Sequence, residues 1–257
     1  MDDQSSQPSN PLDANLKGKV AIIIGGAGAI GSAIATGISR VGATVVLADA
    51  SESTESVWNR IHRETGGDGG ALRMDLTKHV EIEECFRELS TRFGAADIMV
   101  HAAGIYVRRS LLEMSAADWD QTLDVNMRSF FLCTKAAVEQ MLPKNKGRII
   151  GITSGMGVAG RERSSAYSAS KAAMIVFTKS VAMELAGTGI TINLVGPGIT
   201  DSPLMRNANS EEEIRRSESR LGRPLGSPEN VIGPALYLLS DATETVSGTT
   251  LWMRVPG

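Results

Sequence analysis

Tyr167 and Lys171 are two residues whose types and spacing could move a proton. They lie four residues apart in "YSASK", so in a helix they share one face about one turn apart. A free phenol has a pKa near ~10, which is too high for a base at neutral pH. A neighbouring ammonium favours the phenolate, and a partly screened attraction of about 3–4 kcal/mol would lower this pKa by about two to three units. We therefore predict that Tyr167 acts as a general base.

Ser154 could complete this chemistry. It directly follows the apolar run "RIIGIT", 13 residues before Tyr167, and the carboxyl ends of parallel strands face the ligand crevice. Its hydroxyl could hold the substrate oxygen and stabilise developing charge. Plainer explanations stay open, because a Tyr-x-x-x-Lys pair is usually only part of a helix surface and a serine can simply end a strand.

A glycine-rich turn predicts a dinucleotide site. The apolar run "VAIII" leads into "GGAGAIG" and then into a helical pattern. Glycines allow the backbone to turn tightly beside a pyrophosphate, and the helix N-terminus supplies unpaired N–H donors. The residues of this turn that we expect to contact the cofactor are Gly25, Gly28, Ala29 and Gly31.

Asp49 predicts which dinucleotide binds. It follows the second apolar run, 18 residues past Gly31, where a carboxylate can accept hydrogen bonds from the adenosine ribose. The same carboxylate would repel a 2′-phosphate by about 4 kcal/mol at about 4 Å and an effective dielectric constant of ~20. No lysine or arginine lies within the turn or immediately after Asp49. The sequence therefore favours NAD over NADP, although Asp49 could also cap the next helix.

Apolar runs and helical patterns that alternate along the chain must position these residues. Most of the runs are continuous, as in strands buried on both faces of a parallel sheet. The predicted strands are 20–24, 44–48, 71–74, 97–102, 148–153, 191–195 and 250–253, and the predicted helices are 30–40, 54–64, 79–93, 116–141, 165–186 and 228–240. Repeated βα units predict an α/β fold, a doubly wound, Rossmann-type parallel sheet of about seven strands with helices on both faces.

The domain organisation expected from this pattern is simple. A single dinucleotide-binding catalytic domain spans 16–257, and the polar, acidic stretch 1–15 is a disordered tail without the features of a signal peptide. A polar, charged segment at about 199–226 interrupts the alternation of predicted strands and helices. Within it, Ser210 and Glu213 predict a capping box for a short helix. Such an insertion is either a lid over a ligand site or a mobile surface loop.

Composition argues against several function classes. The 257 residues carry a net charge of −3 with the charges mixed along the chain, which gives no footprint for nucleic acid. No apolar segment is long enough to span a bilayer. The two cysteines form no CxxC pair and the three histidines show no metal-ligand spacing. We expect a cytoplasmic protein that binds no metal, no membrane and no nucleic acid.

Several spaced motifs together resemble the short-chain dehydrogenase/reductase family. In chain order they are "GGAGAIG", "MDL", "HAAG", "DVN", "TSGMG", "YSASK", "INLVGPG" and "SPEN". They extend over nearly the whole chain except the tail, and several motifs in the right order are far more specific than any one of them. The family usually has threonine at Ile24 and paired asparagines at His101 and Ala102, so this chain departs from the pattern in its cofactor loops.

The resemblance implies roles for individual residues. The catalytic tetrad would be Asn126, Ser154, Tyr167 and Lys171. Further cofactor contacts would be Ile30, Asp75, Leu76, Ala102, Ala103, Gly104, Pro197, Gly198, Ile199 and Ser202, together with Tyr167 and Lys171. Within the tetrad, Asn126 would anchor a water that links Lys171 to solvent. A homotetramer is also implied.

The substrate is predicted only by class. Arginine can bind a carboxylate bidentately, and "GIYVRRSLLEMSAADWD" also resembles sugar-acid dehydrogenases of the same family. The residues expected to meet the substrate are Ser154, Tyr167, Arg109, Met156, Arg161 and Met205. We therefore expect an NAD-dependent enzyme that interconverts a small-molecule secondary alcohol and a ketone, on a hydroxylated or carboxylate-bearing substrate.

Two alternatives stay open. One is a 3-oxoacyl-thioester reductase that uses NADPH, against which Asp49 argues. The other is a non-catalytic nucleotide-sensing or scaffold protein on the same fold, against which an intact tetrad argues. The arginines named for the substrate could equally lie on the outer surface or at a subunit contact.

Overall fold

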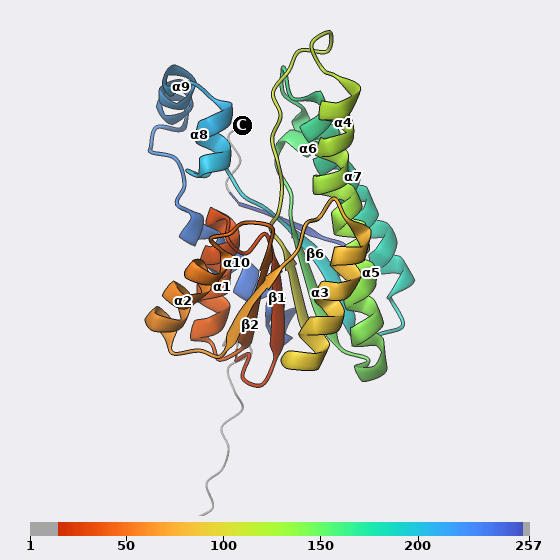
Figure 1. The fold of residues 1–257 in the computed structure, drawn as a ribbon. Helices are drawn as coiled ribbons and strands as arrows, with labels where there is room; N and C mark the ends of the chain where they lie inside the picture. The colour runs from red at the N-terminus through yellow and green to blue at the C-terminus, as the bar shows by residue number, and fades with distance from the viewer. Residues whose placement is uncertain (1–14, 254–257) are drawn as a thin grey trace, which may run out of the picture.

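A single parallel sheet forms the centre of the protein in this computed structural model, which describes residues 15–253 (Figure 1). Its strand order is β3-β2-β1-β4-β5-β6-β7. The strands are β1 (Val20–Ile24), β2 (Thr44–Asp49), β3 (Gly69–Arg73), β4 (Ile98–His101), β5 (Gly147–Ile152), β6 (Ile190–Gly196) and β7 (Thr250–Trp252). Each coincides with a predicted run, so the prediction of a doubly wound sheet of about seven strands is confirmed. The expected tail lies outside the described residues, apart from Asn15.

Helices cover both faces of this sheet (Figure 1). The helices on one face are α1 (Ala29–Arg40), α2 (Thr54–Thr65) and α10 (Ile232–Leu239), and those on the other are α3 (His79–Arg92), α5 (Ser129–Met141) and α7 (Ser165–Glu184). Successive residues of β1 alternate between the two cores: Ile22 and Ile24 pack with α3, whereas Ala21 and Ile23 pack with α1. Burial on both faces explains why this strand shows no polar alternation.

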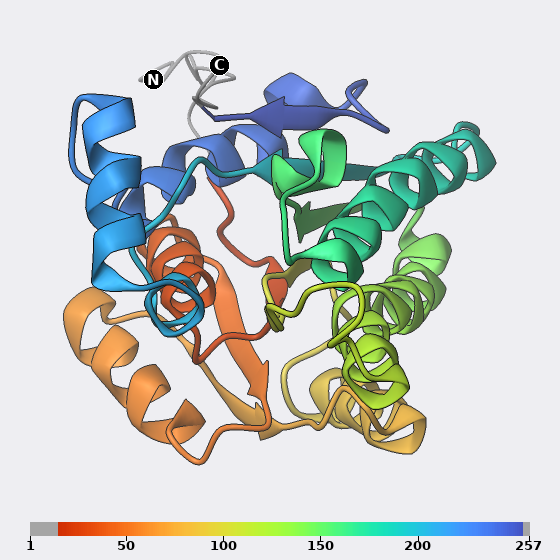
Figure 2. The same ribbon diagram turned by 90° about the horizontal axis from the view of Figure 1, so that it is seen from above.

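The chain reverses its direction of winding at β1, which pairs with both β2 and β4. Connections therefore leave this point toward opposite faces, and a crevice opens beyond the carboxyl ends of the strands. Figure 2 looks down on this end of the sheet. Every loop that carries a predicted functional residue after β1, β4, β5 or β6 lies here.

The long helix predicted over 116–141 is interrupted. It consists of α4 (Ala116–Leu123), a π-helical segment over Asp124–Arg128, and α5. A π-helical turn contains an extra residue and is frequent at functional sites. The 3.6-residue periodicity of the sequence did not predict this widened turn, which carries Asn126.

The 199–226 segment folds into two helices, α8 (Pro203–Ala208) and α9 (Glu211–Leu221). Thr200 forms an isolated parallel bridge with Gly226, so the segment leaves and returns at one point. Ser210 and Glu213 make the predicted capping box at the start of α9. In Figures 1 and 2 the two helices stand beside the crevice end of the sheet. Across residues 15–253, no helix combines the length and the apolar character needed to cross a membrane.

Candidate active site

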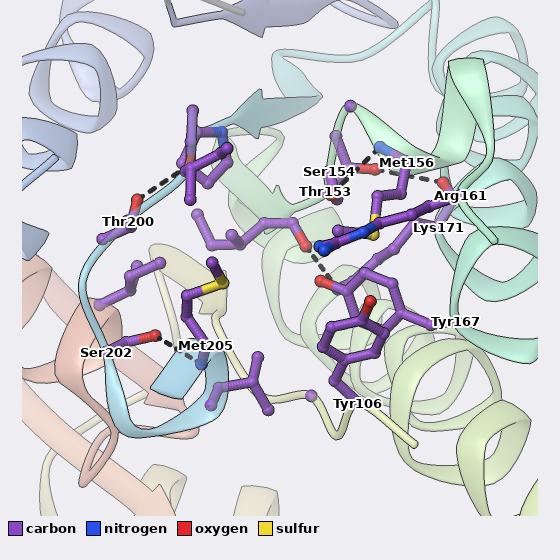
Figure 3. A pocket seen from close by; sticks show the side chains of 18 of the residues that line it. Tyr106, Thr153, Ser154, Met156, Arg161, Tyr167, Lys171, Thr200, Ser202 and Met205 are labelled. Carbon is purple, nitrogen blue, oxygen red and sulfur yellow. Dashed lines mark hydrogen bonds between the residues drawn. The ribbon is translucent and has the colours of Figure 1, made fainter. Parts of the chain in front are cut away.

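A cavity of about 560 Å³ opens at the carboxyl ends of the central strands. Its walls come from the segments that follow β4, β5 and β6, from the short helix α6 (Met156–Ala159), and from α7 and α9. Figure 3 shows Thr200, Ser202 and Met205 on one side of the cavity and Ser154 and Tyr167 on the other. The two sides lie far apart in the sequence, and the sheet brings them together.

Tyr167 and Lys171 lie on one face of α7, as predicted, and both are buried in the cavity wall. Lys171 Nζ lies 5.7 Å from the centre of the Tyr167 ring. It donates a hydrogen bond to the Ile152 carbonyl oxygen at 2.8 Å and approaches Met174 Sδ at 3.6 Å. The end of β5 therefore holds the ammonium near the Tyr167 ring.

Burial changes the pKa values of Tyr167 and Lys171 more than the attraction between the two side chains does. It raises the pKa of Tyr167 to about 12, although a hydrogen bond with Ser154 acts in the opposite direction. Burial also lowers the pKa of Lys171 to about 8. Lys171 alone therefore does not lower the phenol pKa, because desolvation disfavours the phenolate more strongly than one buried cation favours it. The predicted fall stays a prediction for the complex with a positively charged nicotinamide.

Ser154 and Tyr106 complete the surroundings of the phenol. Ser154 follows β5 by two residues, and its Oγ accepts a hydrogen bond from Met156 N at 3.2 Å. The rings of Tyr106 and Tyr167 pack with their centres 4.6 Å apart, and Tyr106 Oη lies 2.7 Å from Ser164 Oγ. The hydroxyls of Ser154 and Tyr167 thus face one corner of the cavity, where both could donate to a carbonyl oxygen (Figure 3).

Asn126 is fully buried and supports this corner from behind. Its Oδ1 accepts from Ile105 N at 2.8 Å, and its Nδ2 donates to Ile105 O and to Ser170 Oγ, each at 3.0 Å. Gly104 lies so close that a Cβ there would be 3.3 Å from Asn126 Oδ1 and 3.7 Å from Lys171 Nζ. Asn126 therefore anchors the loop after β4 and the first half of α7 at the same time.

The glycine turn has the geometry that a dinucleotide needs. Gly25 has a φ of +76°, and a Cβ on Gly31 would lie 2.1 Å from Gly25 O, so only glycine allows the turn to pack this closely on α1. The first turn of α1 carries no acidic residue, and Gly28 provides no side-chain cap. Its N–H groups therefore suit a pyrophosphate.

Most of the predicted cofactor residues are brought together. Those that line the cavity are Ile30, Ala102, Ala103, Gly104, Tyr167, Lys171, Pro197, Gly198, Ile199 and Ser202. Gly25, Gly28, Ala29 and Gly31 form the turn and the start of α1 beside it. Asp75 and Leu76 lie beyond β3, outside the cavity wall, and the Asp75 carboxylate accepts from Thr77 N and Thr77 Oγ1.

Asp49 is the last residue of β2 and is tied to the glycine turn. Its Oδ2 accepts from Ala27 N at 3.1 Å, and its Oδ1 accepts from Ser51 N at 3.0 Å. The sheet register also places Arg73 of β3 next to Asp49. Sequence reasoning missed this neighbour, because the two residues are far apart in the chain and only the strand pairing brings them together.

Among the predicted substrate residues, Ser154, Tyr167, Met156, Arg161 and Met205 line the cavity. Arg109 does not lie in its wall. The Arg109 side chain is exposed, and its Nη1 donates to Arg108 O. The two adjacent arginines lie in an irregular segment, and Arg108 is the half-buried one.

Sequence reasoning offered a lid over a ligand site as one explanation of 199–226 but named no residue of α9 as part of the site. Four residues of this helix line the cavity: Glu213, Arg216, Ser217 and Arg220. Their spacing of three, four and seven residues is that of one helix face, which the sequence contains, but nothing in the sequence showed that this face meets the cavity. Within residues 15–253, no group of three or more His, Cys, Asp or Glu side chains could hold a metal ion.

Comparisons with known proteins agree with this geometry. A family described as enoyl-(acyl carrier protein) reductase matches residues 25–253. The 3-oxoacyl-[acyl-carrier-protein] reductase of Synechocystis sp. is 35% identical over 238 residues, 91% of this chain and 95% of that protein. The reductase of the same name from Vibrio cholerae is 32% identical over 237 residues, 92% of this chain and 96% of that protein.

A solved structure extends the comparison. It is a provisionally named NAD(P)-dependent gluconate 5-dehydrogenase from Beutenbergia cavernae with NADP bound at low occupancy, 31% identical with a TM-score of 0.87. The alignment covers 93% of this chain and 96% of that one. The motifs, the seven-stranded sheet and these matches lead to one conclusion: the chain belongs to the short-chain dehydrogenase/reductase family of nicotinamide-dependent oxidoreductases.

Proposed function

We propose that this protein interconverts a ketone and a secondary alcohol, with Tyr167 as the residue that transfers the proton. The observation that carries the proposal is the buried corner in which Ser154, Tyr167 and Lys171 meet at one wall of the cavity. A bound nicotinamide would supply or accept the hydride. Ser154 would hold the substrate oxygen, and Lys171 would stabilise the phenolate that forms when Tyr167 gives up its proton.

The pKa values indicate how the site without cofactor is prepared for proton transfer. A phenol whose pKa is about 12 is protonated at neutral pH, so it can donate to a ketone oxygen that receives a hydride. Lys171, with a pKa of about 8, is mostly charged at pH 7. Oxidation needs a phenolate, and for that direction the positive ring of a bound oxidised nicotinamide would add to the charge of Lys171.

A 3-oxoacyl thioester is the substrate that the comparisons support best. Both curated relatives described above are named 3-oxoacyl-[acyl-carrier-protein] reductases, which supports this alternative more strongly than the hydroxylated or carboxylate-bearing alcohol expected from the sequence. A sugar acid is a second candidate. It is favoured by Arg161 in the cavity wall and by the gluconate 5-dehydrogenase named for the similar structure.

For the cofactor, we propose NAD, on the ground that the Asp49 carboxylate ends β2 beside the glycine turn. Two observations support NADP instead: Arg73 lies next to Asp49 in the sheet, and the similar structure contains NADP. Asp49→Ala should raise kcat/KM with NADPH relative to NADH by about tenfold or more, because a repulsion of a few kcal/mol is removed. An unchanged ratio would count against the role of Asp49, and a lower ratio in Arg73→Ala would support NADP.

The activity is tested by following the reduced nicotinamide absorbance with a 3-oxoacyl thioester and a panel of ketones. We expect Tyr167→Phe to bind cofactor like the wild type but to turn over about 10²–10⁴ times more slowly. Ser168→Ala, which removes a hydroxyl from the same helix outside the cavity wall, is the matched control and should behave like wild type. Near-normal turnover in Tyr167→Phe would contradict the role of Tyr167 in proton transfer. If the wild type binds cofactor but turns over no ketone, the alternative of a non-catalytic nucleotide-sensing protein would be favoured.

We further propose a homotetramer of single-domain subunits located in the cytoplasm. Phe131 of α5 and the residues Val176 and Met183 of α7 are 43%, 64% and 73% exposed, which supports packing of these helices against another subunit. Phe130 and Met174 instead lie in the subunit's own core. Light scattering of the purified protein tests the oligomeric state.

A further inference from the structure

The helix α9 presents one polar face to the cavity and one apolar residue to the protein. Glu213, Arg216, Ser217 and Arg220 line the cavity, whereas Ile214 is 3% exposed and anchors the helix. The helix is 11 residues long and ends at a left-handed Gly222. Its rotation is therefore fixed, so that Arg216 and Arg220 lie on the helix face that lines the cavity, and both side chains are exposed.

The only carboxylate in the described cavity wall is already neutralised. Arg108, which lies outside the wall, donates from Nη1 and Nη2 to the two carboxylate oxygens of Glu213, each at 3.0 Å. It also donates to Ala208 O at 2.9 Å and to Asn209 Oδ1 at 3.3 Å. The bond with Arg108 lowers the pKa of Glu213 to about 2. Glu213 is thus ionised and paired at neutral pH.

The remaining charges of the wall are all positive: Arg161, Lys171, Arg216 and Arg220. Arg161 reaches from the Tyr167 side of the cavity (Figure 3) to the turn between α8 and α9, where its Nη2 donates to the neutral Asn209 Oδ1 at 3.0 Å. Arg220 makes no ion pair with any residue in 15–253, and Arg216 pairs only with Glu212. Three arginines therefore line the cavity, and the one carboxylate of its described wall, that of Glu213, is already paired with Arg108.

The dinucleotide does not account for this excess. Its pyrophosphate is expected at the glycine turn and the N-terminus of α1, which has no acidic residue in its first turn. Lys171 is held at the bottom of the cavity by Ile152 O. Arg161, Arg216 and Arg220 thus form a separate cationic group at the α9 side.

We propose that Arg161, Arg216 and Arg220 form an oxyanion subsite that holds a negatively charged group of the substrate away from its carbonyl. The proposal rests on the oxidoreductase function proposed above and names the substrate class. The oxyanion has two possible sources, the carboxylate of a small keto acid or the phosphate of a carrier-linked thioester. Guanidinium groups bind both in the same bidentate manner.

Binding is measured by calorimetry with oxidised dinucleotide and a ketone, a combination that cannot react. One probe pair is a 3-oxobutanoyl thioester of N-acetylcysteamine, which is neutral, and the same acyl group on coenzyme A, which carries phosphates. The other pair is a keto-hexonate and its amide. We expect the charged member of one pair to bind at least about tenfold tighter than the neutral one, equivalent to about 1.4 kcal/mol. The pair that shows the difference identifies the source.

Removal of the subsite should affect only the charged probe. In Arg161→Ala, and in a variant with Arg216→Gln and Arg220→Gln, the preference for the charged probe should fall about tenfold while the neutral probe binds as before. Unchanged binding of the neutral probe also shows that the variants fold. Weaker dinucleotide binding with an unchanged charge preference would assign these arginines to the cofactor and overturn the proposal.

Arg108 provides a sharper test, because its removal leaves Glu213 as an unpaired carboxylate in the wall. Arg108→Ala should weaken the charged probe about tenfold and spare the neutral one, whereas Glu213→Gln should not weaken the charged probe. Arg206→Ala, which breaks a bidentate pair with Asp201 in the same segment but outside the cavity wall, is the matched control and should change both probes less than about twofold.

The opposite results overturn the subsite. Equal loss of both probes in Arg108→Ala and in Glu213→Gln would show that the pair acts only by holding α9 in place. Equal affinity for the charged and the neutral probes in wild type would show that the three arginines bind no oxyanion of the substrate. A charge preference in binding without turnover of any probe by reduced cofactor would retain the subsite and reject the proposed activity instead.

Discussion

Replacing Lys171 with methionine should make the folded protein more stable at neutral pH while it abolishes turnover. Lys171 is 3% exposed, and burial lowers the pKa of its ammonium from 10.5 to about 8. At pH 7 the ammonium is therefore charged in both states but poorly solvated in the folded one. A difference of about 2.5 pKa units corresponds to about 3 kcal/mol, by which the charge of Lys171 destabilises the folded state.

A lost hydrogen bond offsets part of the stability that the Lys171→Met variant gains from removal of the charge. The Ile152 carbonyl oxygen loses the hydrogen bond from Nζ, at a cost of about 1 kcal/mol. The net stabilisation at pH 7 should be about 2 kcal/mol, or a Tm higher by about 4–8 °C for a domain of this size. Methionine fills a similar volume in an adaptable way.

The pH dependence distinguishes this mechanism from better packing. Between pH 8 and 10.5 the unfolded chain binds more protons at Lys171 than the folded one, so the wild type gains stability relative to the variant as pH rises. Urea unfolding at pH 7, 8 and 10 should show the advantage of Lys171→Met shrinking steadily.

Lys179→Met is the matched control. Lys179 is exposed on the same helix, so its removal should change the free energy of unfolding by less than about 0.5 kcal/mol at every pH. A Lys171→Met variant that is less stable than wild type at pH 7, or whose advantage does not change with pH, would refute the reasoning from burial.

Two further predictions concern residues that shape the site. Asn126→Ala should lower the free energy of unfolding by about 2–4 kcal/mol, because the N–H and C=O groups of Ile105 lose their partners; urea unfolding measures this, and a loss below about 1 kcal/mol would contradict it. Gly31→Ala should weaken dinucleotide binding at least about tenfold in calorimetry, because its Cβ would lie 2.1 Å from Gly25 O; wild-type affinity would show that the turn can yield.

The strands and most helices could be predicted because their signals are local. β1 is a continuous apolar run that the structure buries on both faces, and the capping box of Ser210 and Glu213 is a pattern of four adjacent residues. The π-helical turn over Asp124–Arg128 was not predicted, because the sequence was interpreted with a uniform period of 3.6 residues across 116–141.

The chemistry of the site was predicted less completely than its residues. The spacing of Tyr167 and Lys171 placed both on one face of α7, but the direction of the phenol pKa depends on how deeply that face is buried. Arg109 was expected at the cavity but is exposed, and the neighbouring Arg108 pairs with Glu213 of the cavity wall without lining the cavity itself. Sequence spacing does not distinguish two adjacent arginines in an irregular segment.

The sequence by itself determined the order of strands and helices, the glycine turn and the helical spacing of the reactive pair, since each depends on residues close together in the chain. Only the tertiary structure decided that Arg73 lies beside Asp49, that Arg108 neutralises Glu213 from 105 residues away, and that α9 turns its arginines toward the cavity. Charge pairing and desolvation depend on distances through space, and these are set by the packing of the sheet and its helices rather than by separation along the chain.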